Sequence, residues 1–174
     1  MASNLQGVKK KGWSPSQSRS SKTPLKILDD YYDKLTLIKD MIGENTTTNI
    51  TLNKIGKQLF KDRFLGVFMS NEIPPMKNKQ MLITNTQSNK QGGEHWIGLY
   101  KYNDKTYFFD SFARDYKTLS KYWKNKNWVN VLQNVNSHQI REQSFRSNAC
   151  GAYSLNFLLN FDKYKLKLIK ILNV

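Results

Sequence analysis

The chemistry that this chain could perform starts with its single cysteine, Cys150. A thiol becomes a strong nucleophile as the thiolate, and a nearby imidazolium or helix N-terminus lowers its pKa. Apolar residues follow Cys150 at helical spacing as far as Phe161, so Cys150 is expected at or near the start of a helix, whose dipole favours a negative sulfur. A lone cysteine is more often a small buried apolar residue. The hypothesis of a nucleophile therefore depends on the residues that accompany it.

A general base must come from one of two histidines, His95 or His138. His95 precedes the apolar and aromatic segment 96–100, which is typical of a buried strand, and the polar residues after it predict a hairpin turn. The returning strand ends at Asp110, so the hairpin brings this carboxylate beside His95, where it can fix the imidazole tautomer and stabilise its cation. His138 lies in a polar stretch without such a partner, and we interpret it as a solvated loop residue.

Five short motifs occur in an order and spacing that resemble the adenovirus-type cysteine proteases (adenain), which share a fold with the SUMO-specific proteases. The motifs are Phe64-Leu65-Gly66, Thr84-Asn85-Thr86, Gly92-Gly93-Glu94-His95-Trp96, Tyr107-Phe108-Phe109-Asp110-Ser111-Phe112, and Gln143 followed by Ser147-Asn148-Ala149-Cys150-Gly151. The resemblance covers roughly residues 64–159. It implies an α+β fold in which a small mixed sheet packs against helices and the nucleophile lies at the N-terminus of a central helix.

The resemblance also implies a role for each candidate residue. The general base is His95, its orienting acid Asp110, the nucleophile Cys150 and the oxyanion-hole donor Gln143. A glutamine amide and the backbone N–H of Cys150 are donors that a tetrahedral intermediate requires. Gln143 stands at the family's usual offset before Cys150, and Gln139 and Gln133 are the alternatives.

Residues beside the predicted base are expected to contact substrate, namely Gly93, Glu94 and Trp96. Trp96 either fills the core or lays its ring on the imidazole or the cleft floor. Two departures from the family accompany this motif. Asp110 stands where adenain has Glu, although SUMO proteases also use Asp, and the hairpin is shorter by one pair of residues, which preserves strand register.

The cysteine count limits the cofactors that the chain can use. One cysteine excludes an internal disulfide, and the lack of further sulfur ligands argues against a structural zinc site. Adenain is activated by a viral peptide that bonds to a second cysteine, which this chain does not have. Any activating peptide would therefore bind noncovalently. No cofactor is required by the sequence, although DNA is a candidate activator.

The net charge of +15 on 174 residues predicts affinity for polyanions. Residues 1–23 form a basic stretch without acidic residues, which predicts a disordered tail before a single protease domain, residues 24–174. Adenain uses viral DNA to find its substrates, so the resemblance supports the same expectation. Non-specific DNA contacts are predicted for Lys9, Lys10 and Lys11 in the tail, and for Lys163, Lys167 and Lys170 on one helical face.

Hydrophobic periodicity and turn signals predict the remaining elements. Helices are expected from Pro24 to Ile42, from a cap at Thr51 to Phe60, and over 116–124, with strands at 65–69, 80–84 and 128–132 and a polar loop at 134–139.

Together these features predict a viral maturation cysteine endopeptidase that cleaves capsid or other structural precursors during virion assembly. We expect a monomer located in the virion and at the intracellular assembly site, because no apolar segment suggests a signal or a membrane span. The resemblance and the Lys- and Asn-rich composition suggest a virophage or a related small DNA virus. Two alternatives are a SUMO- or ubiquitin-like isopeptidase and a non-catalytic, basic DNA-packaging protein on the same fold.

Overall fold

The structure, a computed structural model, describes residues 22–43, 47–87, 95–115, 135–137, 141–144 and 147–172. The helices within these residues are α1 (Lys22–Ile42), α2 (Asn49–Phe60), α5 (Cys150–Tyr164) and α6 (Leu166–Leu172), with a 3-10 turn, η1 (Lys61–Arg63). The strands are β1 (Phe64–Phe68), β2 (Met81–Asn85), β3 (Trp96–Tyr102), β4 (Lys105–Phe109) and β5 (Val135–Ser137).

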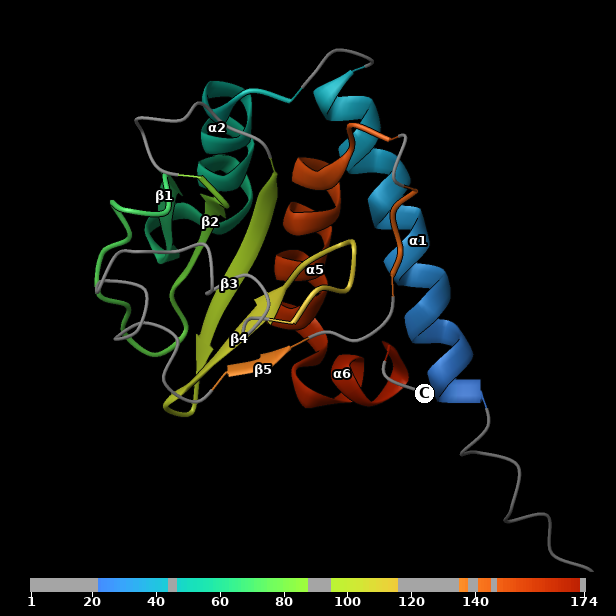
Figure 1. The fold of residues 1–174 in the computed structure, drawn as a ribbon. Coiled ribbons are helices and arrows are strands. Elements are labelled where there is room, and N and C mark those ends of the chain that lie inside the picture. The colour runs from blue at the N-terminus through green and yellow to red at the C-terminus, as the bar shows by residue number, and fades with distance from the viewer. Residues whose placement is uncertain are drawn as a thin grey trace, which may run out of the picture.

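The described strands form one mixed sheet in the order β1-β2-β3-β4-β5. The two central pairings, β2 with β3 and β3 with β4, are antiparallel, whereas β1 and β5 each pair in parallel with their neighbour. Helix α5 lies against one face of the sheet, and α1 packs on the far side of α5 (Figure 1). Sheet and helices form one layered α+β unit around α5, as the sequence predicts.

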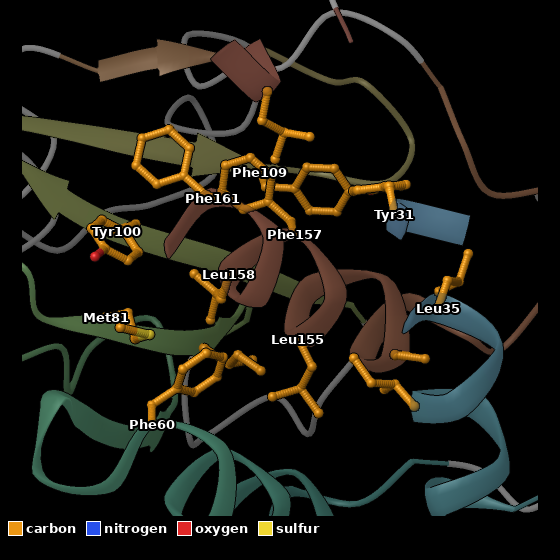
Figure 2. Close-up of a cluster of buried hydrophobic side chains, with 14 of the residues drawn as sticks. Tyr31, Leu35, Phe60, Met81, Tyr100, Phe109, Leu155, Phe157, Leu158 and Phe161 are labelled. Atoms are coloured by element: carbon orange, nitrogen blue, oxygen red, sulfur yellow. The ribbon is translucent and has the colours of Figure 1, made fainter. Parts of the chain in front are cut away.

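The core between the sheet and α5 follows the two-residue alternation of the strands. Met81 and Ile83 face the helices, whereas Leu82 between them faces a smaller apolar cluster on the opposite side of the sheet. Aromatic residues fill the helix side, where Phe109 stacks on Phe157 with ring centroids 4.6 Å apart (Figure 2). Burial of each such side chain stabilises the fold by roughly 1.5–3 kcal/mol. This packing holds α5 rigidly on β3 and β4.

Several predicted elements are present with small shifts. The hairpin between β3 and β4 turns at Asn103 and Asp104, both with positive φ (47° and 61°), which is typical of a type I′ turn. Helix α2 begins before the predicted cap, because the Thr48 hydroxyl accepts a hydrogen bond from the Thr51 N–H at 3.2 Å. Helix α1 begins at Lys22, inside the stretch predicted to be a tail. The predicted helix at 116–124 and strand at 128–132 lie outside the described residues.

Two predictions about the C-terminal half are wrong. Residues 135–137, predicted to be loop, form the edge strand β5. Hydrogen-bond pairing with β4 stabilises this short strand. The single lysine face is interrupted, because Lys165 adopts a φ of 52° and ends α5. Lys163 therefore lies on α5, whereas Lys167 and Lys170 are exposed on α6. Lys163 also pairs with Asp30 at 3.0 Å. None of the helices described is both long and apolar enough to span a membrane.

Candidate active site

The β3–β4 hairpin places His95 and Asp110 side by side at one end of the sheet. His95 immediately precedes β3 and Asp110 immediately follows β4, and Gly98 pairs with Phe109 in the ladder between them. The His95 Nε2 lies 2.7 Å from the Asp110 Oδ1. Both side chains are buried, with exposed fractions of 4 % and 0 %. The structure thus brings the predicted base and the predicted acid together.

Asp110 is held as a carboxylate by three hydrogen-bond donors. Besides His95, the Phe112 N–H donates to Oδ1 at 2.9 Å and the Arg114 Nε donates to Oδ2 at 2.8 Å. Burial alone would raise the pKa of Asp110, but the hydrogen bond and charge of His95, together with the Phe112 N–H and Arg114, bring that pKa below its usual value. A carboxylate with this pKa orients the imidazole and stabilises its cation without taking its proton.

Cys150 is the first residue of α5 and forms a side-chain hydrogen bond with His95. Because Asp110 occupies Nε2, the other ring nitrogen, Nδ1, is the one that remains for the sulfur. Burial raises the pKa of the Cys150 thiol, but His95 and the N–H groups of Trp96 and Gly151 outweigh it, so this pKa lies below the ordinary value. Burial lowers the pKa of His95, whereas Asp110 and Cys150 raise it above the ordinary value. These opposite shifts favour a thiolate–imidazolium pair.

Close contacts with β3 and α2 fix the N-terminal end of α5. The Ser154 hydroxyl donates to the Trp96 carbonyl at 3.1 Å, and a Cβ on Gly98 would lie only 3.3 Å from the Ser154 carbonyl oxygen. On the opposite side, Gly151 packs so closely that a Cβ would lie 2.8 Å from both Leu52 and Thr47 side-chain atoms. These glycines allow the helix to approach near enough for Cys150 to reach His95.

Gln143 bridges the two segments that flank the candidate residues. Its Oε1 accepts a hydrogen bond at 2.6 Å from Ser111, which follows Asp110, and its Nε2 donates at 2.5 Å to the carbonyl of Ser147, in the loop before Cys150. The backbone N–H of Gln143 also donates to the Ser111 carbonyl at 3.0 Å. An amide carries two N–H donors, and among the described residues only the Ser147 carbonyl accepts from this one, which leaves one hydrogen for another acceptor.

A neighbouring carboxyl ties this segment to α1. The Tyr31 hydroxyl donates to the Glu142 Oε2 at 2.6 Å, and the Tyr31 carbonyl accepts a bond from Asn156 of α5 at 3.1 Å. Burial raises the pKa of Glu142 to about 7, although the Tyr31 bond lowers it. The segment that carries Gln143 is therefore attached to α1 and through it to α5.

The aromatic ring on the imidazole is that of Phe112, rather than Trp96. Phe112 stacks on His95 with ring centroids 4.5 Å apart. The Arg114 guanidinium lies over the Phe112 ring, 5.4 Å from its centroid. Trp96 instead packs against the core and donates from Nε1 to the Thr47 carbonyl at 3.3 Å. Sequence reasoning placed Phe112 in a motif without a role and missed Arg114, although its position four residues after Asp110 was a signal.

Several predicted site residues lie outside the described part of the chain. They are the tail lysines Lys9, Lys10 and Lys11, the substrate-contact candidates Gly93 and Glu94, and the alternatives Gln133, His138 and Gln139. Within the described segments, no group of three or more His, Cys, Asp or Glu side chains is arranged to hold a metal ion.

Comparison with known proteins identifies a family for this chain. No individual curated protein matches the sequence significantly. The family of adenovirus endoproteases matches residues 59–174, which is more than half of the chain and includes each of the four residues predicted to be catalytic. This chain therefore belongs to the adenovirus endoprotease family and is a cysteine endopeptidase.

Proposed function

We propose that this protein is a viral maturation protease that cleaves capsid or other structural precursors during virion assembly. The observation that carries the proposal is the buried, hydrogen-bonded series Cys150–His95–Asp110 at the start of α5. A thiol that is merely part of the core would not require a charged histidine and a carboxylate beside it. The family supports a viral protease, and the precursor substrates are the finer part of the proposal.

In the proposed reaction, the Cys150 thiolate attacks the carbonyl carbon of the scissile peptide and the C=O electron pair moves onto oxygen. The His95 imidazolium gives its proton to the leaving amine as the C–N bond breaks, which leaves a thioester. His95 then takes a proton from water, the hydroxide adds to the thioester carbonyl, and collapse releases the acid and the thiolate. Asp110 keeps the imidazole oriented through both steps.

The oxyanion is assigned to the Gln143 amide and the backbone N–H of Cys150. The bonds from Gln143 to Ser111 and Ser147 support this role, because donors that are fixed before the reaction stabilise developing charge most strongly. Loss of one such donor typically lowers kcat by about 10²–10³-fold.

We also propose that non-specific DNA is a partner and an activator, and that no other cofactor is needed. The proposed enzyme acts as a monomer in virions and at the intracellular assembly site. The net charge of +15 supports DNA binding. A virophage or a related small DNA virus is the proposed source.

The test is incubation of the wild-type protein and Cys150→Ala with the structural proteins encoded beside it, followed by mass spectrometry of the fragments. We expect discrete cuts with the wild type alone. Matched reactions with SUMO and ubiquitin conjugates distinguish the maturation protease from an isopeptidase. An isopeptidase would cleave the conjugates and leave the structural proteins intact. Because Cys150 is the single thiol, alkylation by iodoacetamide reports its reactivity directly.

A further inference from the structure

A cavity lies beside the loop that leads into α5. It measures about 210 Å³ and is lined by Lys39, Ile42, Gly43, Thr47, Ser147, Asn148, Ala149 and Ala152. A cavity of this size exceeds the space that a single water needs and has room for a side chain. In Figure 1 the same loop passes next to the C-terminal end of α1. The cavity therefore adjoins Ala149, directly before Cys150, and Ala152, two residues after it.

The position of the cavity relates it to substrate binding. A peptide whose carbonyl reaches the Cys150 sulfur must extend past the flanking backbone, and Ser147, Asn148 and Ala149 line the cavity immediately before the sulfur. Gln143 donates to the Ser147 carbonyl, so the cavity wall is also connected to the proposed oxyanion donor. A side chain close to the scissile bond can enter this space.

Lys39 gives the cavity its chemical character. Among the described residues that line the cavity, Lys39 is the only charged one, and the others are uncharged. Its Nζ lies 4.7 Å from the Tyr153 ring centroid and 3.5 Å from the Tyr153 hydroxyl. Within the described segments no carboxylate pairs with it, whereas Lys34 and Lys163 both pair with Asp30. An exposed ammonium beside a cavity without acidic residues favours an anionic guest.

We propose that this cavity is a substrate subsite for an acidic side chain, Asp or Glu, and that Lys39 determines the preference. The inference rests on the proposed protease function and adds a substrate class to it. The short polar groups of Thr47, Ser147 and Asn148 can hydrogen-bond a carboxylate that Lys39 neutralises. Precursor proteins with an acidic residue at one fixed distance from the cut are then the preferred substrates.

The test is a digest of a proteome-derived peptide library, with cleavage sites read by mass spectrometry. The wild type, Lys39→Glu, Lys39→Gln and Lys26→Glu are compared, because Lys26 is also an exposed lysine of α1 but does not line the cavity. We expect enrichment of Asp or Glu at one position with the wild type and with Lys26→Glu. Lys39→Gln should lose this enrichment, and Lys39→Glu should favour Lys or Arg at that position.

A pair of peptides that differ only by Glu or Gln at the enriched position gives the magnitude. We expect the wild type to prefer the Glu peptide in kcat/KM by about fivefold, with less preference at high salt, and Lys39→Gln to treat both alike. Cleavage by the wild type without an acidic preference overturns the subsite and leaves the protease intact. Complete absence of cleavage by folded wild type, while iodoacetamide still labels Cys150, overturns the protease and the subsite together.

Discussion

Asp110 receives hydrogen bonds from His95, Phe112 and Arg114 in a fully buried position. His95 lies just before the hairpin, whereas Phe112 and Arg114 lie in the segment that follows it, so the carboxylate joins this segment to the imidazole. Its charge is then a fixed component of the site. The consequences for titration can be measured, because the pKa values of Cys150 and His95 are shifted in opposite directions.

The first prediction concerns the pH dependence of activity. The reactive ion pair forms as pH rises through the lowered pKa of Cys150 and is lost as pH rises further through the raised pKa of His95, so kcat/KM should follow a bell-shaped curve. Asp110→Asn removes a cause of the raised His95 pKa. We expect the alkaline limb of this variant to lie at lower pH. We also expect its maximum rate to fall, by as much as about 10⁴-fold.

The matched control for this change is Asp104→Asn, which alters an exposed turn residue of the same hairpin whose positive φ also suits Asn. Its profile should match that of the wild type. An alkaline limb that stays in place in Asp110→Asn would show that the carboxylate does not set the His95 pKa. Rates of Cys150 alkylation give the same information without a substrate.

The second prediction concerns Glu142 and stability. Its pKa rises from 4.5 to about 7 on folding, so the folded state keeps a proton that the unfolded chain releases. The contribution of Glu142 to the free energy of unfolding is therefore fully present below about pH 4.5 and is lost as pH rises to about 7. The loss is on the order of 3 kcal/mol. Glu142→Gln should reduce the decline in stability over this range, as measured by urea unfolding.

Glu72→Gln removes an exposed carboxylate and serves as the control, with an expected pH dependence like that of the wild type. Equal pH dependence in Glu142→Gln and the wild type would mean that Glu142 ionises at its ordinary pKa in the folded protein.

Helix α5 determines, at the scale of elements, whether the candidate residues meet. Its first turn packs on Thr47 and Leu52 through Gly151, where a Cβ would lie 2.8 Å from each. Gly151→Ala should therefore displace the start of α5 and lower the free energy of unfolding by about 1–3 kcal/mol. Thermal unfolding measures the loss, and slower alkylation of Cys150 reports the displacement from His95.

Thr47→Ser removes one of the three methyl groups that a Cβ on Gly151 would meet, the other two being those of Leu52. Combined with Gly151→Ala, it should recover part of the lost stability, because the effects of substitutions on the free energy of unfolding are not additive for residues in contact. If Gly151→Ala unfolds at the same temperature as the wild type, the packing at this helix terminus is looser than the structure indicates.

The elements that sequence analysis predicted well have local signals. The β3–β4 hairpin follows from the apolar and aromatic segments on either side of the polar turn at Asn103 and Asp104, and the start of α5 follows from the apolar spacing after Cys150. Strand β5 has only three residues and depends on its partner β4, and the end of α5 at Lys165 has no glycine or proline to indicate it. Such features arise from tertiary contacts, which override local propensity.

The same distinction applies to the candidate site. The proximity of His95 and Asp110 follows from hairpin geometry alone, because the two residues flank paired strands. The bond between Tyr31 and Glu142 joins residues separated by 111 positions, and no local pattern indicates it. The stacking of Phe112 on His95 depends on the tight turn after Asp110, where Ala113 has a φ of 57°.

Electrostatics belongs to the scale of the whole molecule, since the net charge of +15 is spread along the chain. Under the proposed DNA binding, affinity should fall steeply with salt, and Lys167→Gln/Lys170→Gln should reduce the slope of log K against log salt by about 2. Fluorescence anisotropy with duplexes of unrelated sequence measures both quantities. Lys77→Gln/Lys79→Gln makes the same change in charge on an exposed loop. Equal effects of the two double variants would assign binding to net charge rather than to α6.

The burial of α5 also affects when the protein can act. Cys150 is the first residue of a helix whose side chains form much of the core, and an isolated helix of 15 residues is marginal in water. The helix therefore becomes ordered only as it packs on the sheet. Under the proposed roles, the thiolate–imidazolium pair comes into existence only with the finished fold. A newly synthesised chain therefore cannot cleave other proteins until it has folded.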